Sequence, residues 1–154
     1  MARQSLQPSR DPADYDFAHR LRTRFAETDA MGVIHHAAYL PYLEEARVAY
    51  LRAIGHPYDT VRAGSDASGA SGAGGRDFAV LEVSVQYRKP LYFDDEVDVS
   101  LRIGAVTGTT FQIAYLVSSG GEARATAVTV HGCVDGRGRA TRLPAWVVAE
   151  FGAA

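Results

Sequence analysis

Alternating apolar and polar residues dominate the chain and predict several strands. The first alternating stretch runs from Phe17 to Phe25. Later stretches with the same period cover Leu81 to Arg88, Glu96 to Ile103 and Phe111 to Val117, and a further strand is expected from Ala123 to Val134. Such alternation is typical of strands with one buried face. Because short turns connect the later strands, we expect a largely antiparallel sheet.

One stretch has a helical pattern instead. Residues Ala37–Ile54 carry apolar side chains around most of the helix circumference, which is typical of a helix buried in the middle of a fold. Pro41 is tolerated only in a first turn, so the helix should begin near Ala37 or Ala38, and Gly55 should end it. The expected architecture is therefore α+β, with a curved antiparallel sheet wrapped around one long central helix.

The segments outside this pattern are polar or rich in small residues. Residues 1–14 are polar and contain two prolines, so we expect a flexible N-terminal tail. Residues 63–76 are rich in glycine and serine, which predicts a flexible loop inside a single domain of residues 15–154. The apolar piece 144–151 predicts a short C-terminal helix.

Composition narrows the function classes. The 154 residues carry a formal net charge of −2, which gives no reason to expect a nucleic-acid partner. No apolar run is long enough to cross a bilayer, and the first residues lack the apolar core of a signal peptide. Cys133 is the single cysteine, so neither an intramolecular disulfide nor a cysteine-based zinc site is possible. We expect a cytoplasmic protein without a cofactor and without membrane insertion.

The stretch from Asp29 to Tyr39, between the first strand and the helix, is the best candidate for chemistry. Free N–H groups at a helix start attract negative charge and can stabilise an oxyanion that develops on a carbonyl. A carboxylate upstream, Asp29, could attack that carbonyl or take a proton from a water that does. Gly32 would let the backbone turn tightly between the two parts. The alternative is that Asp29 only caps a turn.

A resemblance to a known family rests on the segments DAMGVIHHAAYL at 29–40 and LEEAR at 43–47. They are similar to the motif of hotdog-fold acyl-CoA thioesterases, and the closest pattern is that of the 4-hydroxybenzoyl-CoA thioesterase family. The segments VQYRKP at 85–90 and DDEV at 94–97 resemble the family's second and third strands. The resemblance implies a hotdog fold, an acyl-CoA substrate, and homodimers or homotetramers with active sites at subunit junctions.

The resemblance also implies roles for single residues. Asp29 matches the family's essential aspartate, which is a nucleophile or a general base depending on the member. His36 matches the histidine at the helix start in the family's Tol-Pal-associated branch. In the hydroxybenzoyl-CoA branch an aromatic residue stands there, and its backbone N–H polarises the thioester carbonyl, so His36 could contribute its N–H, its imidazole or both. Gly32 and Tyr39 match positions that shape the loop and the first turn of the helix. His35 stands at a position that is usually aromatic, and it is a candidate pocket-lining residue.

Three further residues are candidates for substrate binding. Glu44 either pairs with Arg47 three residues later or faces the pocket and assists the attacking water. Arg88 and Lys89 are candidates for binding the CoA phosphates, because the turn at 106–110 lacks the basic cluster that the resemblance would place there. The alternative is that both belong to an ordinary solvated strand end.

Other functions stay open at this point. A hydratase or dehydratase acting on acyl thioesters could use His36 and Glu44 as a pair that faces across the subunit junction, and a non-catalytic acyl-CoA binder would need neither. A metal site built from His35, His36 and Asp29 is disfavoured, because adjacent histidines diverge on most backbones.

Overall fold

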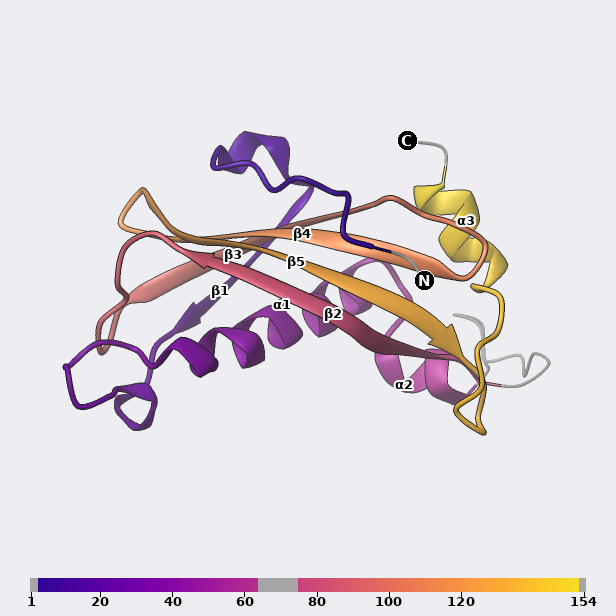
Figure 1. The fold of residues 1–154 in the computed structure, drawn as a ribbon, viewed down its shortest axis with the longest axis horizontal. Coiled ribbons are helices and arrows are strands. Elements are labelled where there is room, and N and C mark those ends of the chain that lie inside the picture. The colour runs from indigo at the N-terminus through magenta and orange to yellow at the C-terminus, as the bar shows by residue number, and fades with distance from the viewer. Residues whose placement is uncertain (1–2, 64–74, 153–154) are drawn as a thin grey trace.

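Five strands form one sheet, and a single long helix lies along one side of it (Figure 1). The structure is a computed structural model that describes residues 3–63 and 75–152. In chain order the strands are β1 (Phe17–Arg22), β2 (Asp77–Tyr87), β3 (Glu96–Gly104), β4 (Thr110–Ser119) and β5 (Glu122–Val134). They are ordered β1-β3-β4-β5-β2, and every neighbouring pair is antiparallel. The predicted α+β architecture is confirmed. Most of the loop predicted at 63–76 lies outside the described residues.

The helix between β1 and β2 begins slightly later than predicted. A single 3₁₀ turn, η3 (His36–Ala38), precedes α1 (Tyr39–Ala53), so Pro41 lies in the first turn as expected. The chain leaves the helix through Gly55, whose φ of 86° is a left-handed conformation that favours glycine.

The predicted C-terminal helix is present as α3 (Ala145–Phe151). The short helix α2 (Tyr58–Ala63) and two further 3₁₀ turns, η1 (Pro12–Asp14) and η2 (Phe25–Glu27), were not predicted. Within the described ranges, no helix combines the length and apolar character that a membrane span requires.

The core lies between α1 and the inner face of the sheet. Six residues of α1 are buried there, namely Tyr39, Tyr42, Leu43, Ala46, Tyr50 and Leu51. The opposite side of the helix carries exposed side chains, including Leu40, Glu44 and Arg52. The expectation of a helix buried on nearly all sides is therefore wrong for the single chain, because a five-stranded sheet covers only one side of it.

Strand β2 is longer than its alternating stretch indicates. It begins at Asp77, and its pairing with β5 shifts register between Val80 and Glu82. One extra residue at a bulge exchanges the two faces of the strand beyond it. Phe78 and Tyr87 are nine positions apart, yet the bulge brings both to the inner face. The alternating stretch from Leu81 to Arg88 does not reveal the bulge, because the shift in register lies at the start of that stretch.

The N-terminal residues lie against the outer face of the sheet (Figure 1). The buried side chain of Gln112 on β4 accepts hydrogen bonds from the backbone N–H groups of Ser5, at 2.9 Å, and Leu6, at 3.0 Å. Its amide nitrogen donates to the carbonyl of Arg3 at 2.9 Å. Gln112 therefore anchors this segment to the sheet, while the flexibility expected for residues 1–14 stays a prediction.

Replacing the anchor should release the segment. We expect Gln112→Ala to lower the free energy of unfolding by about 1–3 kcal/mol, because it removes hydrogen bonds from a nearly buried side chain. Trypsin should then cleave after the exposed Arg10 faster than in the parent protein. Gln86→Ala, which changes an exposed glutamine on the same outer face, is the matched control. Equal cleavage rates in the two variants would contradict the anchoring role.

Candidate active site

The loop that carries Asp29 is closed by its own backbone. Thr28 and Ile34 form an isolated antiparallel bridge at its base. Inside it, the N–H of Asp29 donates to the carbonyl of Val33 at 2.8 Å, and the N–H of Gly32 donates to the carbonyl of Asp29 at 3.0 Å. Gly32 has a φ of 81°, and nothing lies within 4 Å of the place where a Cβ would stand. Glycine is therefore favoured here by backbone conformation rather than by lack of space.

The carboxylate of Asp29 is only partly used by this turn. Its Oδ1 accepts from the N–H groups of Met31, at 2.8 Å, and Val33, at 3.4 Å. Its Oδ2 has no hydrogen-bond or ion-pair partner in the described part of the chain. The side chain is half-buried. Asp29 therefore does cap a turn, and the same capping bonds orient its second oxygen, which is free for another purpose.

The helix start presents one backbone donor. Four of the five amides from residue 34 to residue 38 have acceptors. The N–H of Ile34 donates to the carbonyl of Leu91 at 2.8 Å, and that of His35 donates to the carbonyl of Glu27 at 2.7 Å. The N–H groups of Ala37 and Ala38 donate to Nδ1 of His35 at 3.0 Å and to the carbonyl of His35 at 2.9 Å, respectively. The fifth amide, that of His36, has no acceptor among residues 3–63 and 75–152. It belongs to the first residue of η3, where a helix leaves N–H groups unpaired. A carbonyl oxygen from a substrate could occupy this position.

The two adjacent histidines stack on each other. Their ring centroids are 4.1 Å apart and the planes differ by 28°, so the expected divergence of His35 and His36 is wrong. Because His35 Nδ1 accepts the N–H of Ala37, this ring is the tautomer with hydrogen on Nε2. The side chain of His36 is exposed beside it. The stacking follows from the cap, which turns the His35 ring back over the first residues of η3.

A second carboxylate, Glu27, supports the same loop. Its side chain is 11% exposed and accepts from the hydroxyl of Tyr42 at 2.7 Å and from the backbone N–H of Arg24 at 2.8 Å. The guanidinium of Arg24 lies 3.1 Å from its other oxygen. Burial opposes the charge on Glu27, but these donors outweigh burial and lower its pKa. Burial, together with the negative partner, raises the pKa of Tyr42, so this hydroxyl stays protonated and keeps donating.

Tyr39 and Glu44 lie on opposite sides of α1. Tyr39 is 3% exposed and packs in the core, with its ring edge-on to that of Tyr87 at 5.0 Å. Glu44 is exposed on the open side of α1, and no ion pair joins it to Arg47 in the described part of the chain. Arg47 instead interacts with the buried hydroxyl of Tyr115. A pair of His36 and Glu44 that faces across a subunit junction stays a prediction.

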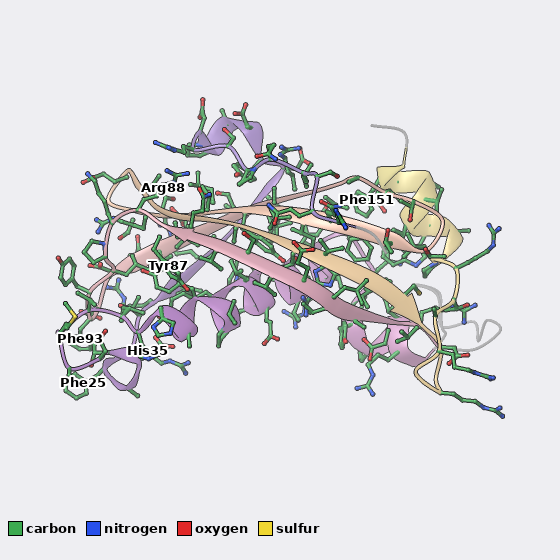
Figure 2. The ribbon with its side chains drawn as sticks, in the orientation of Figure 1. Phe25, His35, Tyr87, Arg88, Phe93 and Phe151 are labelled. Atoms are coloured by element: carbon green, nitrogen blue, oxygen red, sulfur yellow. The ribbon has the colours of Figure 1, made fainter. Side chains whose placement is uncertain are left out.

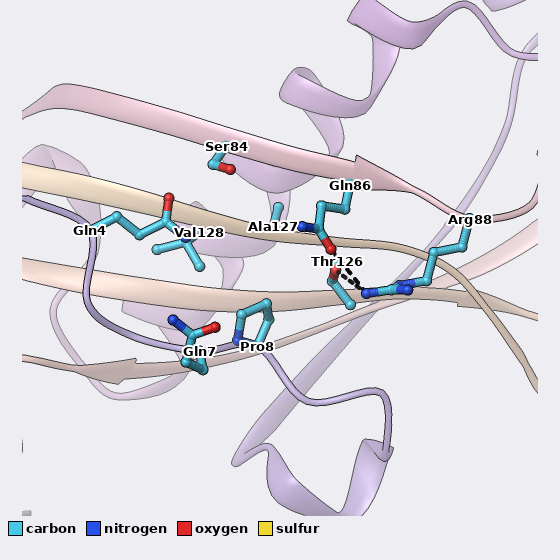
Figure 3. Close-up of a pocket in the computed structure, with 9 residues that line it drawn as sticks. All are labelled: Gln4, Gln7, Pro8, Ser84, Gln86, Arg88, Thr126, Ala127 and Val128. Atoms are coloured by element: carbon cyan, nitrogen blue, oxygen red, sulfur yellow. Dashed lines mark hydrogen bonds between the residues drawn. The ribbon is translucent and has the colours of Figure 1, made fainter.

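The structure does not bring Arg88 or Lys89 to the Asp29 loop. Arg88 points to the outer face of the sheet, where its guanidinium donates to Gln86 at 3.0 Å (Figure 3). It lines a polar hollow of about 130 Å³ beneath the N-terminal segment. Lys89 is paired with Glu122 at the turn between β4 and β5. Any contact of these two cations with a CoA phosphate stays a prediction.

Three residues that hold the site in place, Tyr87, Glu27 and Tyr42, were not predicted from the sequence. Tyr87 lies at the same end of the molecule as His35 (Figure 2), and its hydroxyl donates to the carbonyl of His36 at 2.7 Å. Glu27 and Tyr42 bind each other across fifteen residues of chain. A glutamate three residues after Arg24, just past a strand, is a capping signal that could have indicated Glu27. No local signal indicates Tyr87, because its contact joins residues fifty-one apart.

Comparison with known proteins gives a consistent result. The sequence profile of the thioesterase-like superfamily matches residues 23–151. An acyl-CoA thioesterase of Haemophilus influenzae, YbgC, is 27% identical over 139 residues, covering 90% of this chain and 96% of its own. A 1,4-dihydroxy-2-naphthoyl-CoA hydrolase of Synechococcus elongatus is 29% identical over 127 residues, covering 82% of this chain and 86% of its own.

Solved structures resemble the fold along most of its length. The crystal structure of a hypothetical protein from Aquifex aeolicus has a TM-score of 0.77 at 34% identity, and the match covers 87% of this chain and 98% of that one. A 1,4-dihydroxy-2-naphthoyl-CoA thioesterase from Synechocystis has a TM-score of 0.72 at 21% identity, covering 86% of this chain and 93% of that one, a likeness of fold alone. The expected hotdog fold is confirmed.

The backbone conformation at Gly32 can be tested directly. Gly32→Ala should lower the free energy of unfolding by about 1–2 kcal/mol, because the position has a positive φ that alanine tolerates poorly. The measurement is urea unfolding at neutral pH. Gly136→Ala is the control, since Gly136 is equally open to a Cβ but has no positive φ. An equal and negligible effect of both changes would contradict the assignment.

The stability from Glu27 should depend on pH. The pKa of Glu27 is lower in the folded state than in the unfolded state. Its contribution to the free energy of unfolding is therefore present above the unfolded-state pKa, near 4.5, and is lost as the pH falls through the folded-state pKa. Glu27→Gln should therefore unfold more easily than the parent by about 1–2 kcal/mol at pH 7, and the difference should shrink below pH 4.5. Urea unfolding of both proteins across this range provides the measurement, and a difference that grows on acidification would refute the sign.

Proposed function

This chain belongs to the thioesterase-like superfamily and is a thioester hydrolase, and from that premise we propose that it hydrolyses acyl-CoA to a free acid and CoA. The relatives support CoA as the shared part of the substrate, since one is named for acyl-CoA and another for 1,4-dihydroxy-2-naphthoyl-CoA. Their acyl groups differ, so the proposal concerns the class of thioester and not one acyl chain.

One observation carries the proposed site, namely that a single closed loop presents a free carboxylate oxygen and leads into a helix start with a free donor. Asp29 Oδ2 is available because only Oδ1 is held by the turn. The His36 N–H is available because it has no acceptor among the described residues. We assign Asp29 as the attacking or base carboxylate and the His36 N–H as the donor to the thioester carbonyl.

The chemistry then follows from these two groups. The His36 N–H stabilises the negative charge that develops on the carbonyl oxygen, and one such donor contributes about 10²–10³ in rate. In one route Asp29 removes a proton from water, and the water oxygen bonds to the carbonyl carbon. In the other route Asp29 itself bonds to that carbon, and water later cleaves the resulting anhydride. In both routes the carbon–sulfur bond breaks and CoA leaves as a thiolate that takes up a proton.

We further propose that the protein acts as a homodimer or a larger homo-oligomer. Strand β2 is an edge of the sheet, and it exposes Val80, Leu81 and Val83. Apolar side chains on an unpaired edge strand favour pairing with another chain. The open side of α1 would also gain cover from a second copy, which agrees with the apolar circumference of that helix.

The test of the catalytic assignment is Asp29→Asn. Asparagine keeps an oxygen for the amides of Met31 and Val33, so the loop should stay folded while the free carboxylate is lost. We expect thiol release from a saturated acyl-CoA to fall by more than about 100-fold. A saturated chain is used because a hydratase would release no thiol from it.

The matched control is Asp16→Asn, which changes an exposed aspartate before β1 that has no hydrogen bond in the described structure. Both variants should keep the parent's oligomeric state by size-exclusion chromatography. Near-normal turnover by Asp29→Asn would eliminate Asp29 as the catalytic carboxylate. Failure of the parent protein to release thiol from short, long and aromatic acyl-CoAs would eliminate the proposed substrate class.

A further inference from the structure

The backbone around the His36 N–H is fixed by contacts from three different parts of the chain. The amide of Ile34 is bound to Leu91, in the connection between β2 and β3, and the amide of His35 is bound to Glu27, just after β1. The carbonyl of His36 is bound to the hydroxyl of Tyr87, the last residue of β2. These three contacts hold consecutive residues, and the third acts on the residue that presents the free donor.

The hydroxyl of Tyr87 is well placed for this contact. It reaches the His36 carbonyl at 2.7 Å, and a carbonyl can only accept, so the phenol is the donor. The ring of Tyr87 packs edge-on against Tyr39 in the first turn of α1, with centroids 5.0 Å apart. A tyrosine hydroxyl is protonated at neutral pH, and burial raises the pKa of Tyr87 further. The side chain is 50% exposed, so it contributes far less to the core than a buried tyrosine would.

The direction of Tyr87 depends on the bulge in β2. Phe78 lies on the inner face of the strand and belongs to the core. Nine residues separate it from Tyr87, so in a regular strand the two would lie on opposite faces. The extra residue between Val80 and Glu82 brings Tyr87 to the inner face, beside η3. The hydrogen bond between Tyr87 and His36 therefore depends on the bulge in β2.

We propose that Tyr87 is a positioning residue for hydrolysis, holding the backbone of His36 so that its N–H points to the thioester oxygen. This inference rests on the proposed function of the His36 N–H. Tyr87 touches neither the reacting carbon nor the attacking group. It acts through the peptide on the far side of His36, which the hydrogen bond to its hydroxyl prevents from rotating. This positioning stabilises the transition state, in which the His36 N–H must be aligned with the negative charge that develops on the thioester oxygen.

The test is Tyr87→Phe, which removes the hydroxyl and keeps the ring that packs on Tyr39. We expect kcat for acyl-CoA hydrolysis to fall roughly tenfold while KM changes less than about twofold, as for loss of one neutral hydrogen bond that matters in the transition state. The melting temperature should stay within a few degrees of the parent. Tyr92→Phe is the matched control, because the exposed hydroxyl of Tyr92 has no partner among the described residues.

A second readout does not depend on activity. Hydrogen exchange measured by mass spectrometry should become faster in Tyr87→Phe at the amides of residues 34–39 and stay unchanged in β5. An unchanged kcat overturns the inference, and so does a fall in kcat that comes with faster exchange across the whole sheet, since that marks a general loss of stability. If the parent hydrolyses no acyl-CoA, the proposed function fails, and the exchange measurement still decides whether Tyr87 holds this turn.

Discussion

The satisfaction of backbone polar groups at the start of α1 is the constraint on which the site depends. A helix beginning inside a fold leaves several N–H groups without partners, and buried donors left unpaired are costly. Here neighbouring segments accept the hydrogen bonds of Ile34 and His35, and the His35 side chain and backbone accept those of Ala37 and Ala38. The exposed His36 amide is the exception. The amides on both sides of the His36 N–H are bound, and these bonds fix the turn around it. A fixed donor is what electrostatic stabilisation of a transition state requires.

Two carboxylates two residues apart have been given different surroundings. Glu27 accepts hydrogen bonds on both oxygens, from Tyr42 and from Arg24, and these bonds lower its pKa. It is saturated, so its negative charge serves to fasten the loop. Asp29 is bound through one oxygen only, and the donors are backbone amides of its own turn. The difference in hydrogen bonding separates a structural carboxylate from one that can take part in a reaction.

The edge strand β2 serves both the proposed contact between subunits and the site within one chain. Its exposed apolar residues suit pairing with a second chain, while its last residue, Tyr87, reaches the start of the helix within the same chain. The bulge between Val80 and Glu82 makes both compatible, since it lets Phe78 and Tyr87 face inward from one strand. Assembly at this edge would therefore bring a second subunit close to the turn that carries His36.

The sequence by itself determined the strands, the long helix, the place of Pro41 in its first turn, and the motif around Asp29, because periodicity and spacing are local properties. The tertiary structure decided the rest. Only the fold turned Arg88 to the outer face, left Glu44 without Arg47, and brought Tyr87 to His36 and Glu27 to Tyr42. Each of these depends on strand register, on a bulge that alternation does not reveal, or on which side of a helix meets the sheet. Such relations join residues far apart in the chain, and no short stretch of sequence encodes them.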